Sequence, residues 1–463
     1  MMDLAALKID IDGVAIEENP QLVQQKSRDF YWYSPVLKRR LEGVTAAIVA
    51  RPKDEEELLL VIGACFRNDV PLTVRGSGTG NYGQAMPLAG GLVLDLSGMN
   101  RVKAVKAGTV VAEPGAILAE IDAAVRPSGQ ELRMFPSTYH TASIGGFIGG
   151  GSGGVGSIRW GGLRDAGNVV RVRMAAMDGS IPTVLDLTGP DIHRVSHAYG
   201  TTGVITEVEM PLAPAVDWVD AIVSFPTLEA AVRHGETLAG ADGLLLKNVA
   251  VMDAAIAPFL KRHESYLAEG EAFVVLIAAA FAMTDVVALA TRAGGRIMMR
   301  SDRLDEAERH RLPPAFELAW NHTTLRALRV DPSITYLQVL YPQPDIAGKV
   351  LTMAQLLGDE APTHLEFVRF DGAVGCFGLP LVRYTSEERL DAIVKLHEDH
   401  GCPIFNPHRY TLEEGGMKQT DALQLAFKKR SDPKGLLNPG KMIAWDQPDF
   451  DYGRPYLFPS LSA

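Results

Sequence analysis

The sequence contains few cysteines, and their positions exclude two kinds of protein. Only three occur in 463 residues: Cys65, Cys376 and Cys402. Because they are odd in number and widely spaced, they form neither a disulfide framework nor a CxxC metal or redox pair. This usage is typical of a reducing compartment, and we expect a cytoplasmic protein.

The sequence also has no excess of basic residues. It holds 45 Lys and Arg against 56 Asp and Glu, a formal net charge of −11. A protein that binds nucleic acid needs a basic surface that displaces counterions from the phosphates. Nucleic acid is therefore not an expected partner.

Long hydrophobic runs are missing as well. The longest apolar run, Ala272 to Met283, carries no charge but falls short of the roughly 20 residues that span a bilayer. The opening residues, MMDLAALKIDIDG, lack the basic and apolar regions of a signal peptide. We expect neither a membrane span nor a secretory leader.

The composition that remains is that of an ordinary globular protein, with 47% hydrophobic and 22% charged residues. The chain exceeds the roughly 250–300 residues at which single cores stop growing, so two domains are expected. Strand and helix patterns alternate along the chain, which predicts an α+β fold. The segment from Pro211 to Pro214 is the candidate boundary.

A strand, a helix and a second strand are predicted between Val44 and Val74, from TAAIVA, DEEELLLVIGACFRN and PLTV. RGSGTG, residues 75–80, therefore follows a strand. Its backbone N–H groups could form a concave nest for an anion, because glycine permits positive φ; a plain tight turn is the alternative. Residues 78–83 also match GxGxxG, but Pro87 blocks the helix which that dinucleotide motif requires.

A second glycine cluster lies in residues 136–157, with eight glycines between Ile144 and Gly156. Ordering so many glycines costs much conformational entropy. The embedded Phe147, Ile148 and Val155 disfavour a flexible linker. We expect a backbone wall against a flat, extended ligand.

Taken in order, four motifs resemble those of the FAD-linked oxidases of the vanillyl-alcohol oxidase superfamily. They are RGSGTG at 75–80, the run from Pro136-Ser137 into SIGG at 143–146, GVITE at 203–207 and LNPGKM at 437–442. The resemblance implies a PCMH-type FAD-binding domain with two α/β subdomains, at residues 1–214 and completed by 426–463. It implies an α/β substrate cap domain at 215–425.

The resemblance also implies where FAD is bound. The first glycine segment would hold the pyrophosphate, the second would line the flavin and pyrophosphate, the GVIT strand would contact the adenine end, and the terminal motif would return to the FAD-binding domain. The implied cofactor-binding residues are Arg75, Gly76, Ser77, Gly78, Thr79, Gly80, Pro136, Ser137, Ser143, Ile144, Gly145, Gly146, Gly149, Gly203, Val204, Ile205, Asn438 and Lys441.

Two departures from the family pattern concern covalent attachment of FAD. Members with a covalent link usually carry histidine at the place of Thr79, and bicovalent members carry a cysteine that is absent from residues 130–160 here. We expect non-covalent FAD, with a link to some cap residue as the alternative.

The segment NPHRYTLEEGG at 406–416 contains the candidate catalytic residues. His408 is the preferred base, because histidine titrates near neutral pH; a histidine satisfied by neighbouring backbone is the alternative reading. Tyr410 and Glu414 are alternate bases, and Arg409 or Tyr410 could polarise the leaving oxygen or bind a substrate anion.

The 2-hydroxyacid dehydrogenases of the superfamily have Ser-Gly-Glu-His-Gly at the corresponding distance before Leu-Asn-Pro-Gly-Lys. This chain has Thr411 to Gly415, TLEEG, so Glu414 replaces the family's histidine. His364 lacks the second histidine of their cap metal motif. We therefore predict no metal, and D-lactate, glycolate and 2-hydroxyglutarate are disfavoured as substrates.

Three further polar segments are interpreted as structural rather than catalytic. Trp320 to Thr324, WNHTT, is expected to cap a helix and pack in the core. Glu366 and Arg369 are three positions apart on a predicted strand, so they point to opposite faces. His193 and His197 could pair on a metal, but neighbouring glycines favour solvated positions.

The function that follows from the resemblance is oxidation of a small or aromatic alcohol, hydroxyacid or related C–H donor by hydride transfer to flavin N5. The alternatives are oxidation of a sugar-like secondary alcohol and a flavin-binding electron-transfer partner without turnover. A small-molecule substrate is expected, the electron acceptor stays open, and the acidic surface with apolar cap strands would permit a homodimer.

Overall fold

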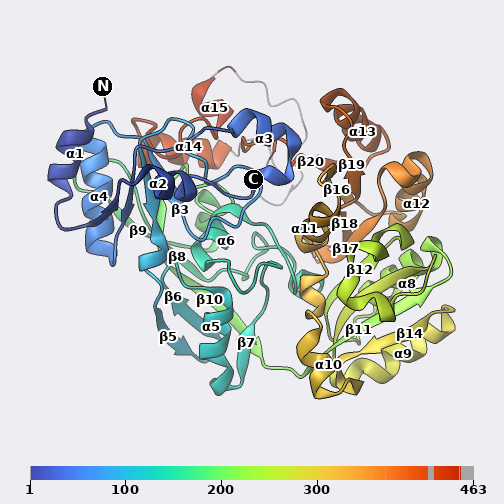
Figure 1. Cartoon of the computed structure of the whole chain (residues 1–463). Helices are drawn as coiled ribbons and strands as arrows, with labels where there is room; N and C mark the ends of the chain where they lie inside the picture. Colours follow the sequence, from blue (N-terminus) through green and yellow to red (C-terminus); the bar gives the residue numbers. More distant parts are fainter. Residues whose placement is uncertain (1, 371, 416–421, 448, 450–463) are drawn as a thin grey trace.

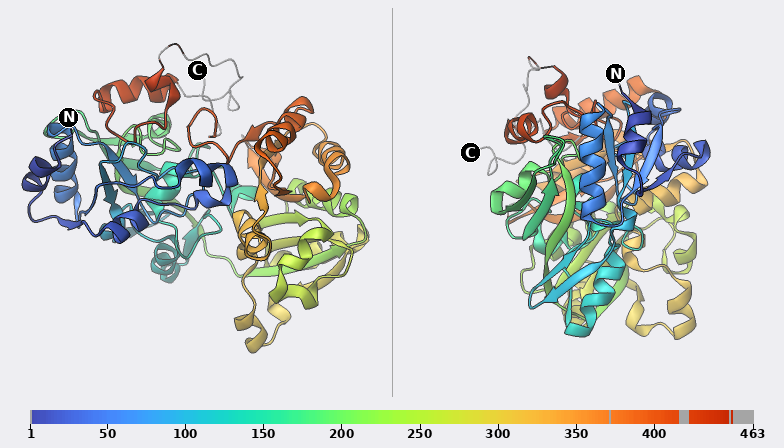
Figure 2. Two further views of the ribbon diagram at one scale, coloured as in Figure 1. Left: turned by 45° about the horizontal axis from the view of Figure 1, so that its top comes forward. Right: turned by 90° about the vertical axis from the view of Figure 1, so that its left-hand side faces the viewer.

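The computed structural model describes residues 2–370, 372–415, 422–447 and 449. Two lobes lie side by side (Figure 1), and Figure 2 shows them from two further sides. The first lobe holds the N-terminal half of the chain with α14 (Ala422–Ser431) and α15 (Ile443–Asp446). The chain passes to the second lobe between β10, which ends at Pro214, and β11, which begins at Trp218.

A four-stranded sheet, in the order β1-β2-β4-β3, forms one part of the first lobe. β2, β4 and β3 are parallel, and β1 pairs antiparallel with β2. The predicted strand–helix–strand is confirmed as β2, α4 and β3; Asp54 caps α4 through the Glu57 N–H. The elements here are α1 (Leu4–Asp10), β1 (Ala15–Glu17), α2 (Pro20–Lys26), α3 (Pro35–Leu41), β2 (Ile48–Arg51), α4 (Glu55–Arg67), β3 (Leu72–Arg75) and β4 (Leu92–Asp95).

A second sheet of six strands follows, in the order β5-β6-β10-β8-β9, with β7 also on β10. Its elements are β5 (Val102–Lys106), β6 (Thr109–Ala112), α5 (Leu118–Val125), β7 (Gln130–Leu132), α6 (Ile144–Gly150), α7 (Ser157–Trp160), β8 (Arg171–Ala175), β9 (Val184–Thr188) and β10 (Val204–Pro214).

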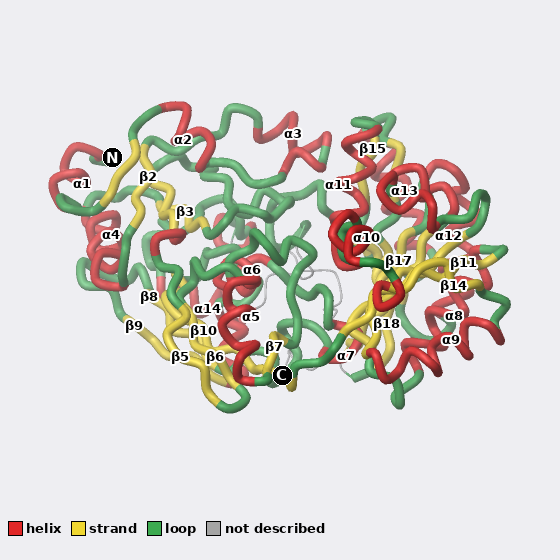
Figure 3. The backbone as a smooth tube through the Cα atoms, turned by 60° about the horizontal axis from the view of Figure 1, so that its bottom comes forward, coloured by secondary structure: helices red, strands yellow, loops and turns green. Residues whose placement is uncertain are grey.

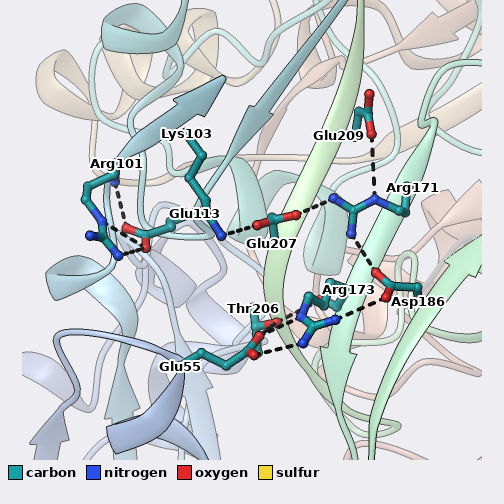
Figure 4. A network of polar contacts seen from close by, with 10 residues as sticks. All are labelled: Glu55, Arg101, Lys103, Glu113, Arg171, Arg173, Asp186, Thr206, Glu207 and Glu209. Atoms are coloured by element: carbon teal, nitrogen blue, oxygen red, sulfur yellow. Dashed lines mark hydrogen bonds and ion pairs between the residues drawn. The ribbon is translucent and has the colours of Figure 1, made fainter. Parts of the chain in front are cut away.

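Ion pairs connect this second sheet to α4 (Figure 4). The Arg173 guanidinium donates to both oxygens of Glu55, at 2.9 and 3.0 Å. Thr206 on β10 donates to the same carboxylate at 2.8 Å. The two sheets of the first lobe are thereby held together at their charged edge.

The second lobe is built on an eight-stranded antiparallel sheet, in the order β14-β11-β13-β12-β17-β18-β16-β20. Its strands are β11 (Trp218–Phe225), β12 (Leu246–Met252), β13 (Ala272–Ala279), β14 (Arg296–Arg300), β16 (Gln338–Tyr341), β17 (His364–Phe370), β18 (Ala373–Gly378) and β20 (Ile404–Phe405). β15 (Ile334–Tyr336) and β19 (Leu381–Arg383) form a separate pair.

The two faces of this sheet are both buried, so its strands lack polar alternation. Ala221 and Val223 of β11 pack under the helices on one face, whereas Ile222 packs toward the first lobe. The helices of this lobe are α8 (Leu228–Gly240), α9 (Met283–Arg292), α10 (Glu306–Arg311), α11 (Asn321–Val330), α12 (Ile346–Leu357) and α13 (Glu387–Asp399). α8, α9, α12 and α13 cover the outer face, and α11 lies on the side of the first lobe (Figure 1).

The end of the described chain returns to the first sheet. Leu72 of β3 donates to Leu436 O, and Asn438 N donates to Leu72 O, both at 2.8 Å. Lys428 of α14 and Asp432 form a buried ion pair at 2.7 Å. Of the helices the structure describes, none combines the length and apolarity needed to cross a membrane.

Candidate FAD site

A cavity of about 240 Å³ lies where the glycine segments of the first lobe meet the second lobe. Loops and α6 gather between the sheets of the two lobes (Figure 3). Thirteen of the eighteen residues predicted to bind the cofactor line this cavity: Gly76, Ser77, Gly78, Thr79, Gly80, Pro136, Ser137, Ser143, Gly145, Gly146, Gly149, Gly203 and Ile205.

The first glycine segment exposes bare backbone to the cavity. The N–H groups of Gly78, Thr79, Gly80 and Asn81 donate to no acceptor within the described parts of the chain. Gly78 has a φ of +68°, which a side chain rarely adopts. No helix follows, since the next element is β4, and the segment is therefore a nest rather than a dinucleotide turn of the βαβ type.

Arg75 braces this segment from behind and does not line the cavity. Its guanidinium donates to the carbonyl of Arg28 and, at 3.2 Å, to the carbonyl of Ser77. Both bonds hold the loop in its turn. Burial lowers the pKa of Arg75, partly offset by Asp95 and Asp29.

The second glycine segment contains a short helix, α6, where the sequence predicts only a backbone wall. Ile144 and Ile148, four residues apart, are buried in the core, whereas Phe147 and the glycines of α6 line the cavity. Ile144 consequently does not line the cavity. Ser143 Oγ accepts the Ser77 N–H at 3.2 Å, and a Cβ on Gly76 would overlap that hydroxyl.

The third wall is made by residues 195–205. His197 N donates to Ile148 O and Tyr199 N to Gly149 O, both at 2.9 Å, which fastens this wall to α6. Gly203 and Ile205 line the cavity, while Val204 is buried in the core below. His197 is itself buried, not the solvated position that the sequence indicates.

The terminal motif supports the walls from outside. The Asn438 carboxamide donates to Tyr199 O at 2.6 Å and to Gln84 O at 2.9 Å. Lys441 is fully buried and donates to Gly83 O at 2.5 Å. Burial lowers the pKa of Lys441 and raises the pKa of Asp29, which lines the cavity, and the charge of each group opposes the shift of the other.

The structure brings none of the four predicted catalytic side chains to this cavity. His408 is 2% exposed; its Nδ1 lies 2.7 Å from Ser34 Oγ, and its Nε2 lies 2.9 Å from Tyr336 O. Burial lowers its pKa to about 3. Both ring nitrogens are therefore engaged in the core, away from the cavity.

The other three candidates lie further out. Arg409 pairs with Glu387 at 3.3 Å and Asp391 at 3.6 Å on α13. Tyr410 packs against the Lys441 ammonium, and Glu414 is exposed and accepts from Thr411. From the described part of this segment, only Gly415 lines the cavity.

The cavity is completed by part of the segment WNHTT, interpreted above as structural, and by two aromatic residues. Trp320, Asn321 and His322 line it from the start of α11, and Phe30 and Tyr33 line it from the aromatic run FYWY. In the sequence, the aromatic run FYWY and the polar pair Asn321-His322 beside Trp320 were the features that could have indicated these lining residues. Thr323 and Thr324 are buried core residues, as expected.

The residues present fit a dinucleotide cofactor with a diphosphate. Four unpaired N–H groups can hold phosphate oxygens. A Cβ on Gly149 would meet no protein atom within 4 Å, so open space lies beside this wall. Within the described residues no group of three or more His, Cys, Asp or Glu could hold a metal.

A family model described as an FAD binding domain matches residues 46–184, the part that supplies both glycine segments. This match confirms the resemblance to FAD-linked oxidases for that part of the chain. This FAD-linked protein has the predicted PCMH-type FAD-binding fold.

Individual relatives agree with this family. The chain is 24% identical over 448 residues to the glycolate oxidase subunit GlcD of Bacillus subtilis, covering 89% of this chain and 92% of the relative. It is 32% identical over 184 residues to an uncharacterised FAD-linked oxidoreductase of Mycobacterium tuberculosis, where the match spans 37% of this chain and 38% of the relative.

Among solved structures, 4-ethylphenol oxidase from Gulosibacter chungangensis has the same fold, with a TM-score of 0.68, 18% identity and coverage of 94% of this chain and 95% of that one. At this identity the likeness concerns the fold alone.

Proposed function

We propose that this protein is an FAD-dependent oxidoreductase that oxidises an alcohol, hydroxyacid or related C–H donor and holds its FAD without a covalent bond. The observation that carries the proposal is the cavity wall of bare N–H groups at Gly78, Thr79, Gly80 and Asn81. When bound, the flavin supplies the two-electron acceptor of the reaction.

The chemistry of each segment indicates which part of FAD it would contact. The first glycine segment would hold the diphosphate, and the glycine face of α6 would lie along its length. Gly203 and Ile205 would bound the far end. Thr79 has no nucleophilic ring nitrogen, which supports non-covalent binding.

The division into domains is part of this proposal. We assign residues 1–214 with 426–463 to the FAD-binding domain and 215–425 to the cap. The two sheets of the first lobe and the return of Asn438 to β3 support the first assignment. The separate eight-stranded sheet supports the second.

For the substrate, the relative GlcD makes 2-hydroxyacids the first class to test. Glu414 and His364 depart from the motifs of the 2-hydroxyacid dehydrogenases. We therefore expect the substrate to be a 2-hydroxyacid other than D-lactate, glycolate or 2-hydroxyglutarate. Sugar-like secondary alcohols form the second class. A flavin-binding partner without turnover is the remaining alternative.

The test is the visible spectrum of purified protein before and after acid precipitation, followed by anaerobic titration with a panel of 2-hydroxyacids, aromatic alcohols and sugar alcohols. We expect yellow colour in the supernatant and bleaching of bound FAD by one panel member. Colour retained in the pellet would reveal a covalent link. Tightly bound FAD that no panel member bleaches would favour the partner without turnover.

A further inference from the structure

The second lobe presents a polar edge to the cavity at the start of α11, beside Gln338 of β16. Trp320 precedes the helix, and Asn321 and His322 are its first residues; all three line the cavity. The edge belongs to the second lobe, whereas the bare N–H groups belong to the first.

The backbone at Trp320 is strained. Its φ is 53° and its ψ is −143°, a conformation that a large L-residue rarely adopts. Such a residue persists only where its surroundings hold it, and the cost is on the order of 1–3 kcal/mol. This strain turns the chain so that the next two residues reach the cavity.

A buried carboxylate holds Trp320 in place. Glu366 on β17 is fully buried, and its Oε1 accepts the Trp320 N–H at 2.6 Å. His364 Nε2 lies 2.9 Å from the same oxygen. Asn248 on β12 donates to Glu366 Oε2 at 3.4 Å and accepts the Trp320 indole N–H at 3.1 Å.

Asn321 and His322, in contrast, have polar side-chain atoms without a hydrogen-bond partner in the described structure. The Asn321 side-chain oxygen is buried and has no hydrogen-bond partner in the described structure. Neither ring nitrogen of His322 bonds to any residue that the structure describes. A buried polar group without a partner costs about 1–3 kcal/mol, which a bound ligand can recover.

His322 lies among basic groups. Arg326 and Arg329 lie on its own helix, and His140 faces it from the loop before α6; Glu317 pairs with Arg326 at 3.2 Å. Burial, helped by these groups, lowers the pKa of His322 to about 4. The imidazole is neutral near pH 7 and can accept a proton.

We propose that Asn321 and His322 form the subsite for the reacting hydroxyl: a ring nitrogen of His322 receives the hydroxyl proton, and the Asn321 carboxamide donates an N–H to a second oxygen on the neighbouring carbon. Glu366 is a positioning residue that acts through Trp320. The inference rests on the proposed function and names its substrate class as alcohols with an adjacent oxygen.

The proposed step balances as follows. The O–H bond breaks and its proton passes to His322. The C–H bond breaks and its electron pair leaves with the hydrogen as hydride, with oxidised FAD as the two-electron oxidant. A C=O bond forms, and the product is a 2-oxo compound or its aldehyde equivalent.

His322→Gln tests this assignment, with His310→Gln on exposed α10 as the matched control. We expect both variants to keep wild-type FAD content, and His322→Gln to reduce its FAD ~10²–10⁴-fold more slowly under anaerobic conditions. The wild-type rate should rise through about pH 4 and stay level to pH 8. FAD-loaded His322→Gln that reduces at the wild-type rate would overturn the inference.

A second readout is independent of turnover. In NMR spectra of protein with isotope-labelled histidines, the His322 ring resonance is identified by its loss in His322→Gln. We expect it to shift when 2-hydroxy-2-methylpropanoate is added, an analogue with the hydroxyl and adjacent oxygen but no transferable C–H. An unchanged signal at saturating analogue would contradict the subsite.

The positioning role predicts a graded effect. Glu366→Gln keeps an acceptor oxygen for the Trp320 N–H, and we expect a fall in rate below tenfold. Glu366→Leu removes it, and we expect a loss approaching that of His322→Gln with the His322 signal displaced in folded protein. Equal rates in Glu366→Gln, Glu366→Leu and wild type would remove Glu366 from the site.

The outcomes separate the two proposals. If no panel compound bleaches wild-type FAD, the proposed oxidation itself fails. If wild type is bleached and His322→Gln is bleached equally fast, only the assignment of this edge fails.

Discussion

Gly149, a single residue in the wall formed by α6, allows the cofactor position to be tested without disturbing the fold. An added Cβ would meet no protein atom within 4 Å, and yet Gly149 lines the cavity. We expect Gly149→Ala not to lower the melting temperature of flavin-free protein, because alanine favours a helix more than glycine does, and to weaken FAD binding by about tenfold, or ~1.4 kcal/mol. Titration of FAD into flavin-free protein measures this.

Gly240→Ala, at the end of α8, is the control, because a Cβ there also meets no atom within 4 Å. Its FAD affinity should equal that of wild type. Unchanged affinity in Gly149→Ala would place the cofactor away from α6.

His408 leads to the opposite expectation, a loss of stability without a loss of chemistry. Replacing it with leucine leaves the Ser34 hydroxyl and the Tyr336 carbonyl without their buried partner. We expect His408→Leu to lower the free energy of unfolding by about 2 kcal/mol and to keep the rate of FAD reduction in the folded fraction. A hundredfold slower reduction by FAD-loaded variant would restore His408 as the base.

At the scale of an element, α8 carries a buried histidine whose protonation opposes folding. His234 packs on Phe225 with ring centroids 4.9 Å apart, and burial lowers its pKa to about 4. Between pH 6.5 and 4 the unfolded chain takes up a proton there and the folded chain does not. Stability from this group is therefore present above pH 6.5 and lost as pH falls toward 4.

His234→Phe removes that dependence, while every other titrating group is shared with wild type. The free energy of unfolding of the variant minus that of wild type should increase as pH falls from 6.5 to 4, by up to ~1.4 kcal/mol per pH unit. Urea unfolding at several pH values measures the difference. A difference independent of pH would show that His234 titrates normally; exposed His310→Gln serves as the control.

At the scale of the whole molecule, a buried ion pair joins the two lobes. Glu131 on β7 accepts from Lys247 on β12 at 2.8 Å and from the Trp218 indole on β11 at 2.9 Å. Arg126 adds a bond at 2.9 Å. Burial lowers the pKa of Lys247, although Glu131 opposes the shift. This junction links β7 of the first lobe to β11 and β12 of the second lobe.

Removing one partner should cost more than removing the pair. We expect Glu131→Gln to destabilise the protein by about 3–5 kcal/mol, because the Lys247 charge stays buried without its counter-ion. The double variant Glu131→Gln/Lys247→Met should recover most of this loss. Urea unfolding of the four proteins of the cycle is the measurement; additive losses would show that the two residues are not coupled.

The glycine wall of the cavity could be predicted from the sequence because its chemistry is local. Glycines after a strand free the backbone N–H groups wherever the fold places that strand, so Gly76 to Gly80 and Gly145 to Gly149 could be identified in order along the chain. Ile144 and Val204, also predicted to bind the cofactor, are buried in the core instead. Packing decides which side of an element faces the core, and the sequence does not show it.

The polar edge could not be predicted in the same way. Trp320 and Glu366 are far apart in sequence, and only the pairing of β12 with β17 and the docking of α11 bring them within hydrogen-bond distance. The position of His408 could not be predicted for the same reason, because its segment is polar in sequence and yet His408 is buried against Ser34 and β15 in the structure.

The sequence by itself determined the mixed α+β fold and the glycine segments that line the cavity, because spacing and backbone freedom are properties of short segments. Only the tertiary structure decided which polar residues face that wall. Burial engages both nitrogens of His408 in the core and leaves those of His322 open to the cavity, and burial is set by how distant elements pack.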